Sequence, residues 1–338
     1  MRSTPLSLFA LAALSPPASM ARGVWLGGPW PYLALAHALG AAIVLDLMLP
    51  RAADAAPADT EFPAANALLV VLAILSLMAL PVTVWAVAGP SGLPLPSRAA
   101  LFFAMGFWLA QVTHPAAHEL IHRPKPLFWL GLACYTAVLF GHHTSSHRLV
   151  HHRHVGSNRD PNTARLGEGF YRYLRRAWIG SLIHGYRAER ALRQPTPYVI
   201  YTAGALACLA AGYALAGWPG LAVWLGLGLH TATQILLSDY VQHYGLTRST
   251  DANGRTAPVT AAHSWNAPHL FSSALTLNAT RHSDHHTHPQ RPYPALHLAP
   301  DAPLLPWPLP LACMVALWPP LWHRRMAPLV AKHMLPQA

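Results

Sequence analysis

The stretch RAALFFAMGFWLAQVTHPAAHELIH, residues 98–122, joins a long apolar run to a pair of histidines. Its apolar part, Arg98–Ala117, has about the 20 residues that a helix needs to span a bilayer. His118 and His122 lie four positions apart, so their imidazoles share one face of a helix. Because imidazole is the commonest metal ligand in proteins, the stretch predicts a membrane helix that ends in a metal site.

The composition of the whole chain supports a membrane protein. Of the 338 residues, 53% are hydrophobic and only 10% are charged, whereas a soluble domain has about 25% charged residues. We therefore expect an all-α membrane protein, a single domain over residues 1–338, with about six transmembrane helices and a cytoplasmic histidine-rich region. The predicted spans are Leu6–Met20, Pro31–Leu49, Ala65–Ala88, Arg98–Ala117, Tyr198–Gly217 and Gly220–Ser238. Two shorter or proline-broken stretches, Leu127–Phe140 and Leu304–Trp322, are expected to be re-entrant, interfacial or packed against the metal region.

The distribution of basic residues predicts the orientation. Of 23 lysines and arginines, 12 lie in 118–197 and seven in 240–338. By the positive-inside rule, these segments and their histidines face the cytoplasm. The basic residues flank apolar spans and are not interleaved with exposed aromatics, so nucleic-acid binding is not expected. Arg2 followed by the apolar run Leu6–Met20 also resembles a secretory leader, and either interpretation keeps the direction of the second span.

Nine histidines in four segments are the predicted metal ligands. They are His118 and His122, then His147, His151 and His152, then His243, and finally His282, His285 and His286. Nine imidazoles are too many for one ion, so two ions with four or five nitrogens each are the simplest arrangement. His142 and His143 are expected to support the site without binding metal. His154 and His288 are expected to point elsewhere.

Three acidic residues lie within or beside these segments. Glu119, Asp160 and Asp284 are expected to orient imidazoles by accepting a ring N–H. His118-Glu-x-x-His122 is also the zinc protease motif, with the glutamate as general base. That interpretation is disfavoured, because such a site needs one further ligand and not seven further histidines.

Two residues on the predicted spans could serve the site as well. Trp108 is a candidate for lining a substrate channel, although ordinary packing is the favoured interpretation. Asp46 lies near the end of the second span. Acids inside a membrane are usually functional, but one at a helix end can be solvated.

The four segments together resemble the integral-membrane non-haem di-iron alkane 1-monooxygenases, within the fatty acid desaturase and hydroxylase superfamily. The order is HExxH, HxxxHH, HYGL and then Arg281-His-Ser-Asp-His-His286, and the clear match covers about 110–297. The segment 159–168 is similar to that family too. Two positions depart from its usual pattern: Ser146 and Gln242 each stand where the family commonly has glutamate. Related xylene-type hydroxylases carry glutamine at the second position.

The resemblance implies an oxidoreductase that hydroxylates the terminal carbon of medium- or long-chain alkanes. It implies two iron ions, cycling between Fe(II) and Fe(III), with O2 as co-substrate, and electrons from rubredoxin and rubredoxin reductase. The hydrophobic substrate would enter from the bilayer of the bacterial inner membrane. Cys134, Cys208 and Cys313 are scattered in apolar contexts, so the chain has no four-cysteine iron site of its own.

Several alternatives remain open at this point. A xylene-type aromatic methyl hydroxylase would use the same chemistry, and so would a membrane fatty acyl desaturase or lipid hydroxylase. The HxxxHH segment and the HYG element favour hydroxylation over desaturation. A metal transporter is the non-enzyme alternative, but transport sites usually lie near the membrane midplane. Substrate chain length, the electron donor and the oligomeric state are not determined by the sequence.

A cluster of arginines follows the second histidine segment. It consists of Arg172, Arg175, Arg176, Arg187, Arg190 and Arg193. A solvated positive-inside face explains it. The alternative hypothesis is that it forms part of the docking surface for an acidic electron carrier.

Overall fold

The computed structural model describes residues 5–49 and 62–334. These residues are mostly helical, with the isolated bridges Thr250–Thr256 and Asn266–Leu304 in place of strands. Arg2, on which the leader interpretation depends, lies outside the described residues. In chain order the elements are α1 (Leu6–Leu26), α2 (Trp30–Ala36), η1 (His37–Ala41), α3 (Ala42–Met48), α4 (Ala65–Ala88), α5 (Leu95–Trp108), η2 (Leu109–Thr113), α6 (His114–Ile121), α7 (Leu127–Ala137), α8 (His143–Ser146), η3 (His147–His151), α9 (His152–His154), α10 (Phe170–Ala191), α11 (Tyr198–His243), η4 (Ala261–His263), α12 (Leu270–Leu275), α13 (His282–Thr287), η5 (Tyr293–Ala295), α14 (Leu309–Ala316) and α15 (Pro319–Met334).

Among the described residues, three helices are long and apolar enough to cross a membrane. They are Trp30–Met48, Ala65–Ala88 and Tyr198–His243. These three helices cover four of the six predicted spans, since the last helix includes both the fifth and the sixth. Two of the predicted segments are helical but lie outside these three: α1 contains Pro16 and Pro17, and the helix from Leu95 to Ile121 carries polar side chains in its second half.

The longest helix is bent into two arms. Ala216 and Gly217 leave helical backbone geometry, and Gly217 has φ 62°, a conformation that glycine adopts without a steric penalty. The two arms lie against each other, because a Cβ at Gly212 would be only 2.9 Å from the carbonyl oxygen of Gly220. The predicted fifth and sixth spans are therefore the two arms of α11.

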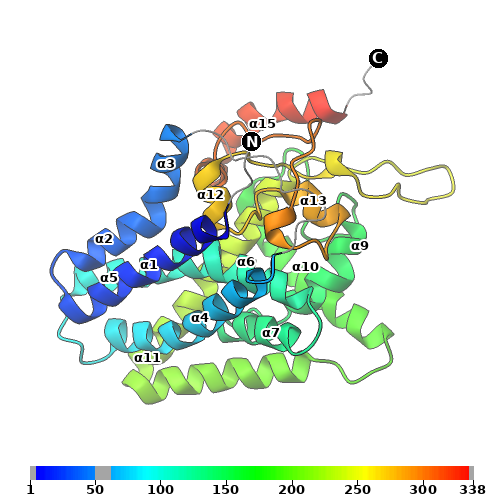
Figure 1. Cartoon of the computed structure of the whole chain (residues 1–338). Coiled ribbons are helices and arrows are strands. Elements are labelled where there is room, and N and C mark those ends of the chain that lie inside the picture. The colour runs from blue at the N-terminus through cyan, green and yellow to red at the C-terminus, as the bar shows by residue number, and fades with distance from the viewer. Residues whose placement is uncertain (1–4, 50–61, 335–338) are drawn as a thin grey trace.

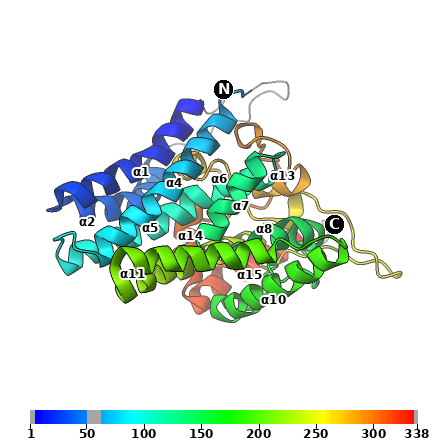
Figure 2. The same cartoon turned by 90° about the horizontal axis from the view of Figure 1, so that it is seen from below.

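The apolar helices are arranged so that several of their connections lie close together. Figures 1 and 2 show that the connection from α1 to α2, the connection from α4 to α5 and the bend of α11 lie at one end of the molecule. The histidine-bearing elements α6, α9 and α13 gather toward the opposite part. The histidine segments thus meet because each follows or adjoins an apolar helix that ends on the same side.

The first histidine segment is held in place by α7. Gly131 on α7 faces α6 so closely that a Cβ there would be 2.7 Å from the carbonyl oxygen of Ala117 and 2.9 Å from Leu120 Cβ. The apolar stretch that begins at Leu127 therefore packs against the metal region, one of the three placements expected for it. Trp108 is 1% exposed and its indole nitrogen donates to the carbonyl oxygen of Ala13 at 3.1 Å. It joins α5 to α1 and lies outside the cavity described below.

Asp46 has a structural role. Its carboxylate accepts hydrogen bonds from the backbone N–H groups of Phe271 (2.7 Å) and Ser272 (3.1 Å). These donors belong to the first turn of α12, where backbone N–H groups lack a partner within the helix. Asp46 is 5% exposed. It thereby anchors the segment that leads to the last histidine group to the helix Trp30–Met48.

The close approach of α6 and α7 yields a stability prediction. Gly131→Ala should destabilise the protein by about 1–3 kcal/mol, because the added methyl overpacks against backbone that cannot move aside. The thermal unfolding midpoint in detergent should fall. Gly40→Ala is the matched control, since a Cβ at Gly40 meets nothing within 4 Å. Equal midpoints for the two variants would contradict the packing argument.

Candidate metal centre

The nine predicted ligands form two groups in the structure. The first group contains His118, His122, His147, His152 and His285, and the second contains His151, His243, His282 and His286. Within each group, one ring nitrogen of every member lies within 4.8 Å of those of the others. Each group draws on several elements, so neither exists until α6, η3, α9, α11 and α13 are packed together.

The second histidine segment divides between the two groups because its helix contains a π turn. The backbone N–H of His152 donates to the carbonyl oxygen of His147, five residues earlier, instead of four. A wider turn of this kind is frequent at functional sites. It places His147 and His152 side by side, with their Nε2 atoms 2.8 Å apart. His151 points to the second group instead.

The spacing of the ring nitrogens is suited to metal ions. The Nε2 atoms of His118 and His147 lie 2.7 Å apart, and those of His152 and His285 lie 3.2 Å apart. In the second group, His282 Nε2 lies 2.9 Å from His243 Nε2 and 3.1 Å from His286 Nε2. Nitrogen ligands about 2.1 Å from a shared ion, at right angles to one another, would lie roughly 3 Å apart.

Hydrogen bonding alone does not satisfy these rings. His147 Nε2 faces both His118 and His152, but an imidazole nitrogen carries at most one hydrogen. His122 Nε2 and His151 Nε2 are buried without a hydrogen-bond partner. Burial and the charge of neighbouring histidines hold the pKa values of His147 and His152 well below the ordinary range, which leaves their lone pairs free. A cation in each group would satisfy the convergent nitrogens.

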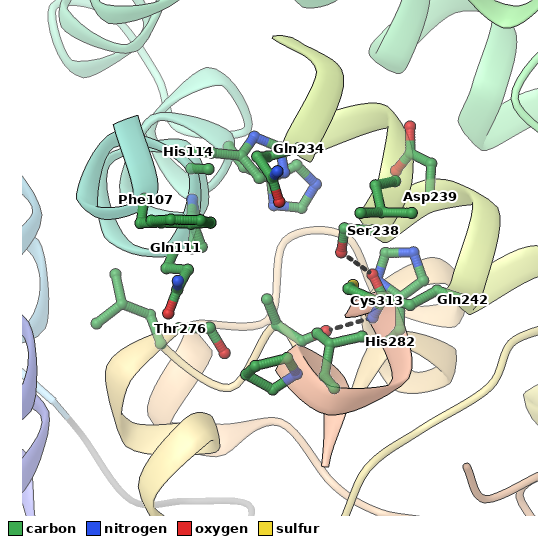
Figure 3. A pocket seen from close by; sticks show the side chains of 18 of the residues that line it. Phe107, Gln111, His114, Gln234, Ser238, Asp239, Gln242, Thr276, His282 and Cys313 are labelled. Atoms are coloured by element: carbon green, nitrogen blue, oxygen red, sulfur yellow. Dashed lines mark hydrogen bonds between the residues drawn. The ribbon is translucent and has the colours of Figure 1, made fainter. Parts of the chain in front are cut away.

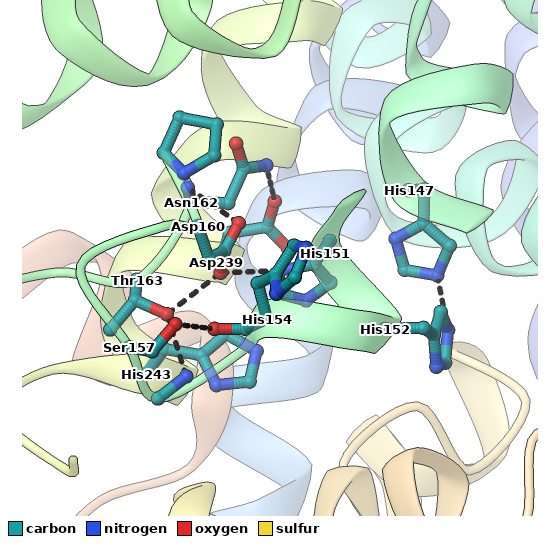
Figure 4. A network of polar contacts seen from close by, with 12 residues as sticks. His147, His151, His152, His154, Ser157, Asp160, Asn162, Thr163, Asp239 and His243 are labelled. Atoms are coloured by element: carbon teal, nitrogen blue, oxygen red, sulfur yellow. Dashed lines mark hydrogen bonds and ion pairs between the residues drawn. The ribbon is translucent and has the colours of Figure 1, made fainter. Parts of the chain in front are cut away.

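Asp160 orients His151. Its carboxylate lies 2.8 Å from His151 Nδ1 and also accepts hydrogen bonds from the Thr163 hydroxyl (2.7 Å) and the backbone N–H of Asn162 (3.0 Å), as Figure 4 shows in part. Burial opposes charge on both groups, yet their pairing raises the pKa of His151 and lowers the pKa of Asp160. Because Asp160 holds Nδ1, His151 is left with Nε2 to offer to the second group.

Glu119 and Asp284 differ from the expectation. The Glu119 carboxylate is bonded to Arg123 at 2.7 Å and to the backbone N–H of Tyr293 at 3.2 Å. Asp284 is bonded to Arg291 at 2.6 Å and to the backbone N–H of His297. In the described part of the chain, neither carboxylate is hydrogen-bonded to one of the nine candidate ligands. Glu119 instead holds the segment after the last histidine group against α6, and Asp284 holds that segment against α13.

The remaining histidines near the site lie outside both groups. His143 is fully buried beside Phe140, and His142 Nε2 lies 3.3 Å from the Ser181 hydroxyl. His154 is half-buried and belongs to neither group, and the ring of His288 bonds to Asp284 at the surface. These four residues belong to neither nitrogen group.

Two residues near the site were missed by the sequence analysis. His114 Nδ1 lies 2.9 Å from the Tyr135 hydroxyl, one helical turn before His118. Its four-residue spacing from His118 was the available signal. Asp239 is a buried carboxylate that accepts a hydrogen bond from Asn162 Nδ2 at 2.7 Å. An acid directly after an apolar span was the signal there.

A cavity of about 300 Å³ ends at the metal centre. His118, His147 and His285 of the first group and His282 of the second line it. The rest of the wall is mainly apolar, with residues from the helix Trp30–Met48, α5, α11 and α14. Figure 3 shows polar side chains on two sides of it, Gln111 and His114 on one and Ser238, Asp239 and Gln242 on the other. The cavity therefore connects an apolar compartment to candidate ligands of both groups.

Comparison with known proteins places these features in a family context. The family described as fatty acid desaturase matches residues 94–309. The chain is 29% identical to alkane 1-monooxygenase 2 of Pseudomonas aeruginosa, over 89% of this chain and 84% of that protein. It is 31% identical to alkane 1-monooxygenase 2 of Alcanivorax borkumensis over 63% of this chain, and spans only 58% of that relative's length. It is 28% identical to the xylene/toluene monooxygenase hydroxylase component XylM of Pseudomonas putida, over 90% of this chain and 84% of that protein.

The grouping of the histidines yields a prediction on metal content. We expect two metal ions per chain, and we expect His285→Ala and His243→Ala each to remove about one, since each takes a nitrogen from a different group. Metal analysis of the purified protein measures this. His154→Ala and His288→Ala are the controls and should keep both ions. A content near one ion in the parent protein would contradict the arrangement.

The contact of Asp160 yields a second prediction. Asp160→Asn should weaken metal binding in the second group by about 10–100-fold, because the amide cannot fix His151 in the same way. Titration with a competing chelator measures the affinity. Asp284→Asn is the comparison, and should leave metal affinity nearly unchanged while lowering thermal stability, since its partners are Arg291 and His297. Equal chelator curves for the Asp160→Asn variant and the parent would refute the role of Asp160.

Proposed function

The chain belongs to the fatty acid desaturase family, and from that premise we propose that it is a membrane monooxygenase that hydroxylates the terminal carbon of medium- or long-chain alkanes. The overall reaction consumes one alkane, one O2, two electrons and two protons, and releases one primary alcohol and one water. The alkane 1-monooxygenases to which the chain is similar support this assignment.

One structural observation supports the proposal most strongly. The cavity of about 300 Å³ is mainly apolar, and it terminates on His118, His147, His285 and His282. A hydrocarbon has no group that a polar site could hold, so it must be positioned by shape and by burial of its surface. An apolar cavity that ends at the nitrogen groups would bring a terminal carbon to them.

The donor set suits iron. Imidazole is a good ligand for iron, and the two groups contain no carboxylate. Two iron ions, when bound there, would supply the O2-dependent oxidation that an unactivated C–H bond requires and that acid–base groups cannot provide. The part of the chain described here holds the nine imidazoles, excludes water around them and places the substrate cavity beside them.

We propose that the substrate enters from the bilayer. A shallow apolar groove runs along the helix Trp30–Met48 and is lined by residues from Leu35 to Leu45. Leu39 lines both this groove and the cavity, so the two hollows adjoin at that residue. The backbone makes a π turn at His37–Ala41, where the helix is locally widened. Rotation of Leu39 would connect the groove to the cavity.

The localisation and the electron supply are also proposals. The excess of basic residues in the histidine-bearing segments favours an inner-membrane protein with its metal centre toward the cytoplasm. Three cysteines cannot supply a four-cysteine iron site, and the proposed source of electrons is rubredoxin with rubredoxin reductase.

A second candidate function is hydroxylation of a methyl group on an aromatic ring. It is favoured by the similarity to the xylene/toluene monooxygenase component, which extends over 90% of this chain. Gln242 lines the cavity, donates to the carbonyl oxygen of Ala279 at 2.9 Å and accepts from the Ser238 hydroxyl. These side chains make one wall of the cavity more polar than an alkane needs.

A substrate panel separates the two functions. The iron-loaded protein, coupled to rubredoxin and its reductase, should convert alkanes to primary alcohols. Any single alanine replacement among the nine histidines should abolish or nearly abolish turnover. Preferred conversion of xylenes would favour the second function. Zinc in active protein, or turnover of neither substrate class with any reductant, would overturn the hydroxylase assignment.

The cavity itself yields a further prediction. Ala110→Phe should fill part of the cavity and raise the Michaelis constant for long alkanes more than for short ones, because Ala110 lines it. Steady-state kinetics with a chain-length series measures this. Ala99→Phe is the matched control, since Ala99 is an exposed residue of α5 that does not line the cavity. An equal change in the Michaelis constants of both variants would show that filling of the cavity is not the cause.

A further inference from the structure

A second hollow, separate from the substrate cavity, lies beside the metal centre. It is a surface cleft of about 450 Å³ between the segment 157–166, the residues after His243 and the end of α15. Its lining includes Asp160, Thr163, Arg165, Leu166, Gly245 and Met334. None of the cleft-lining residues lines the substrate cavity.

One residue that lines this cleft is hydrogen-bonded to a candidate metal ligand. Asp160 lines the cleft and its carboxylate lies 2.8 Å from His151 Nδ1 (Figure 4). Another part of the cleft lining is close in sequence to a member of the second nitrogen group. Gly245 follows His243 by two positions, and with φ 73° and no side chain it lets Val330 of α15 approach. The cleft is thus built directly onto the second nitrogen group.

The rim of the cleft combines apolar and cationic side chains. Leu166 is 57% exposed and Met334 is 39% exposed. Arg159 and Arg165 are exposed on the same segment that supplies Asp160. Arg248 and Arg153 are neighbours, since the Arg248 guanidinium donates to the backbone carbonyl oxygen of Arg153 at 3.0 Å. An apolar centre with a charged rim is the usual composition of a protein–protein interface.

The arginine cluster proposed from the sequence fits a docking role less well. Arg176 is occupied, because its guanidinium binds the Glu168 carboxylate at 2.6 and 2.9 Å and two backbone carbonyl oxygens. The other arginines of α10 share the exposed face with Ile179 (53% exposed) and Leu182 (42% exposed). That mixture is typical of a helix lying in a membrane interface, where arginines meet lipid headgroups.

We propose that the cleft lined by Asp160, Arg165, Leu166 and Met334 is the docking site of a small acidic protein that carries one electron at a time on an iron–sulfur centre. The inference rests on the proposed function, since an O2-dependent hydroxylase needs an external electron donor. Two successive dockings of the reduced carrier supply the two electrons of one turnover, and each leaves the carrier oxidised by one electron. Cationic side chains on the rim steer the acidic carrier, while Leu166 and Met334 provide the apolar contact.

Binding measurements test the site without relying on turnover. Oxidised bacterial rubredoxin is titrated onto the full-length protein in nanodiscs, and the dissociation constant is measured across a series of salt concentrations. The double variant Arg159→Glu, Arg165→Glu should raise the dissociation constant at least about tenfold and flatten its salt dependence, because reversed rim charges repel an acidic partner. The matched control is Arg172→Glu, Arg175→Glu on α10, which should bind like the parent.

A second variant separates docking from damage to the segment 157–166. Leu166→Asp places a single charge in the exposed apolar centre and should also weaken binding about tenfold. Metal content is measured in every variant, and unchanged content shows that the Asp160–His151 contact is intact.

The outcomes keep this proposal distinct from the proposed function. Unchanged rubredoxin affinity in both cleft variants, or equal losses in the α10 control, overturns the docking site. So does failure of rubredoxin to bind the parent protein. Hydroxylation by the parent protein with a chemical reductant would leave the proposed function standing in any of these cases, whereas its absence with every donor would remove that function instead.

Discussion

Mutual repulsion and burial of the nine imidazoles is the constraint on which the rest of the structure depends. Several of their Nε2 atoms lie about 3 Å apart, and His122 Nε2 and His151 Nε2 are buried without a hydrogen-bond partner in the protein. An unpaired buried polar atom costs about 1–3 kcal/mol. The arrangement becomes favourable once a cation lies at the centre of each group, because every lone pair then has a partner. We therefore regard metal binding as part of the folding of this region. We expect the positions of the helices that converge there to depend on metal binding as well as on the packing of their side chains.

The acidic residues around the metal centre position the segments that carry the histidines. The chain has 12 acidic residues and 23 lysines and arginines, yet buried carboxylates are concentrated near the histidines. Asp160 acts on an imidazole directly. Glu119 and Asp284 act on arginines and on backbone N–H groups of the segment around Tyr293 and His297. The Glu119–Tyr293 contact joins residues far apart in sequence, so it holds the segment after the last histidine group against the helix that carries the first histidine segment.

The two hollows beside the metal centre differ in ways that match the two reactants of a hydroxylase. The substrate cavity reaches both nitrogen groups and is mainly apolar, so a hydrocarbon can bind there with little loss of solvation. The cleft shares no lining residue with this cavity, reaches the second nitrogen group through the Asp160–His151 contact, and has exposed arginines nearby. A layout of this kind lets electrons arrive without admitting water or a bulky protein to the place where the C–H bond would be attacked.

The sequence by itself determined the class of protein, the nine candidate ligands and the family resemblance, because those depend on composition and short-range spacing. The four-residue spacing of His118 and His122 defines one helical face in any fold. Contacts between side chains from different elements could be identified only from the tertiary structure. The π turn that separates His151 from His152, the Asp46 contact with α12 and the occupation of Arg176 by Glu168 all join residues whose proximity no local pattern encodes. Glu119 and Asp284 were assigned imidazole contacts because carboxylates commonly make them, but nearby arginines compete for the same oxygens, and only the packed structure decides which partner an acid meets.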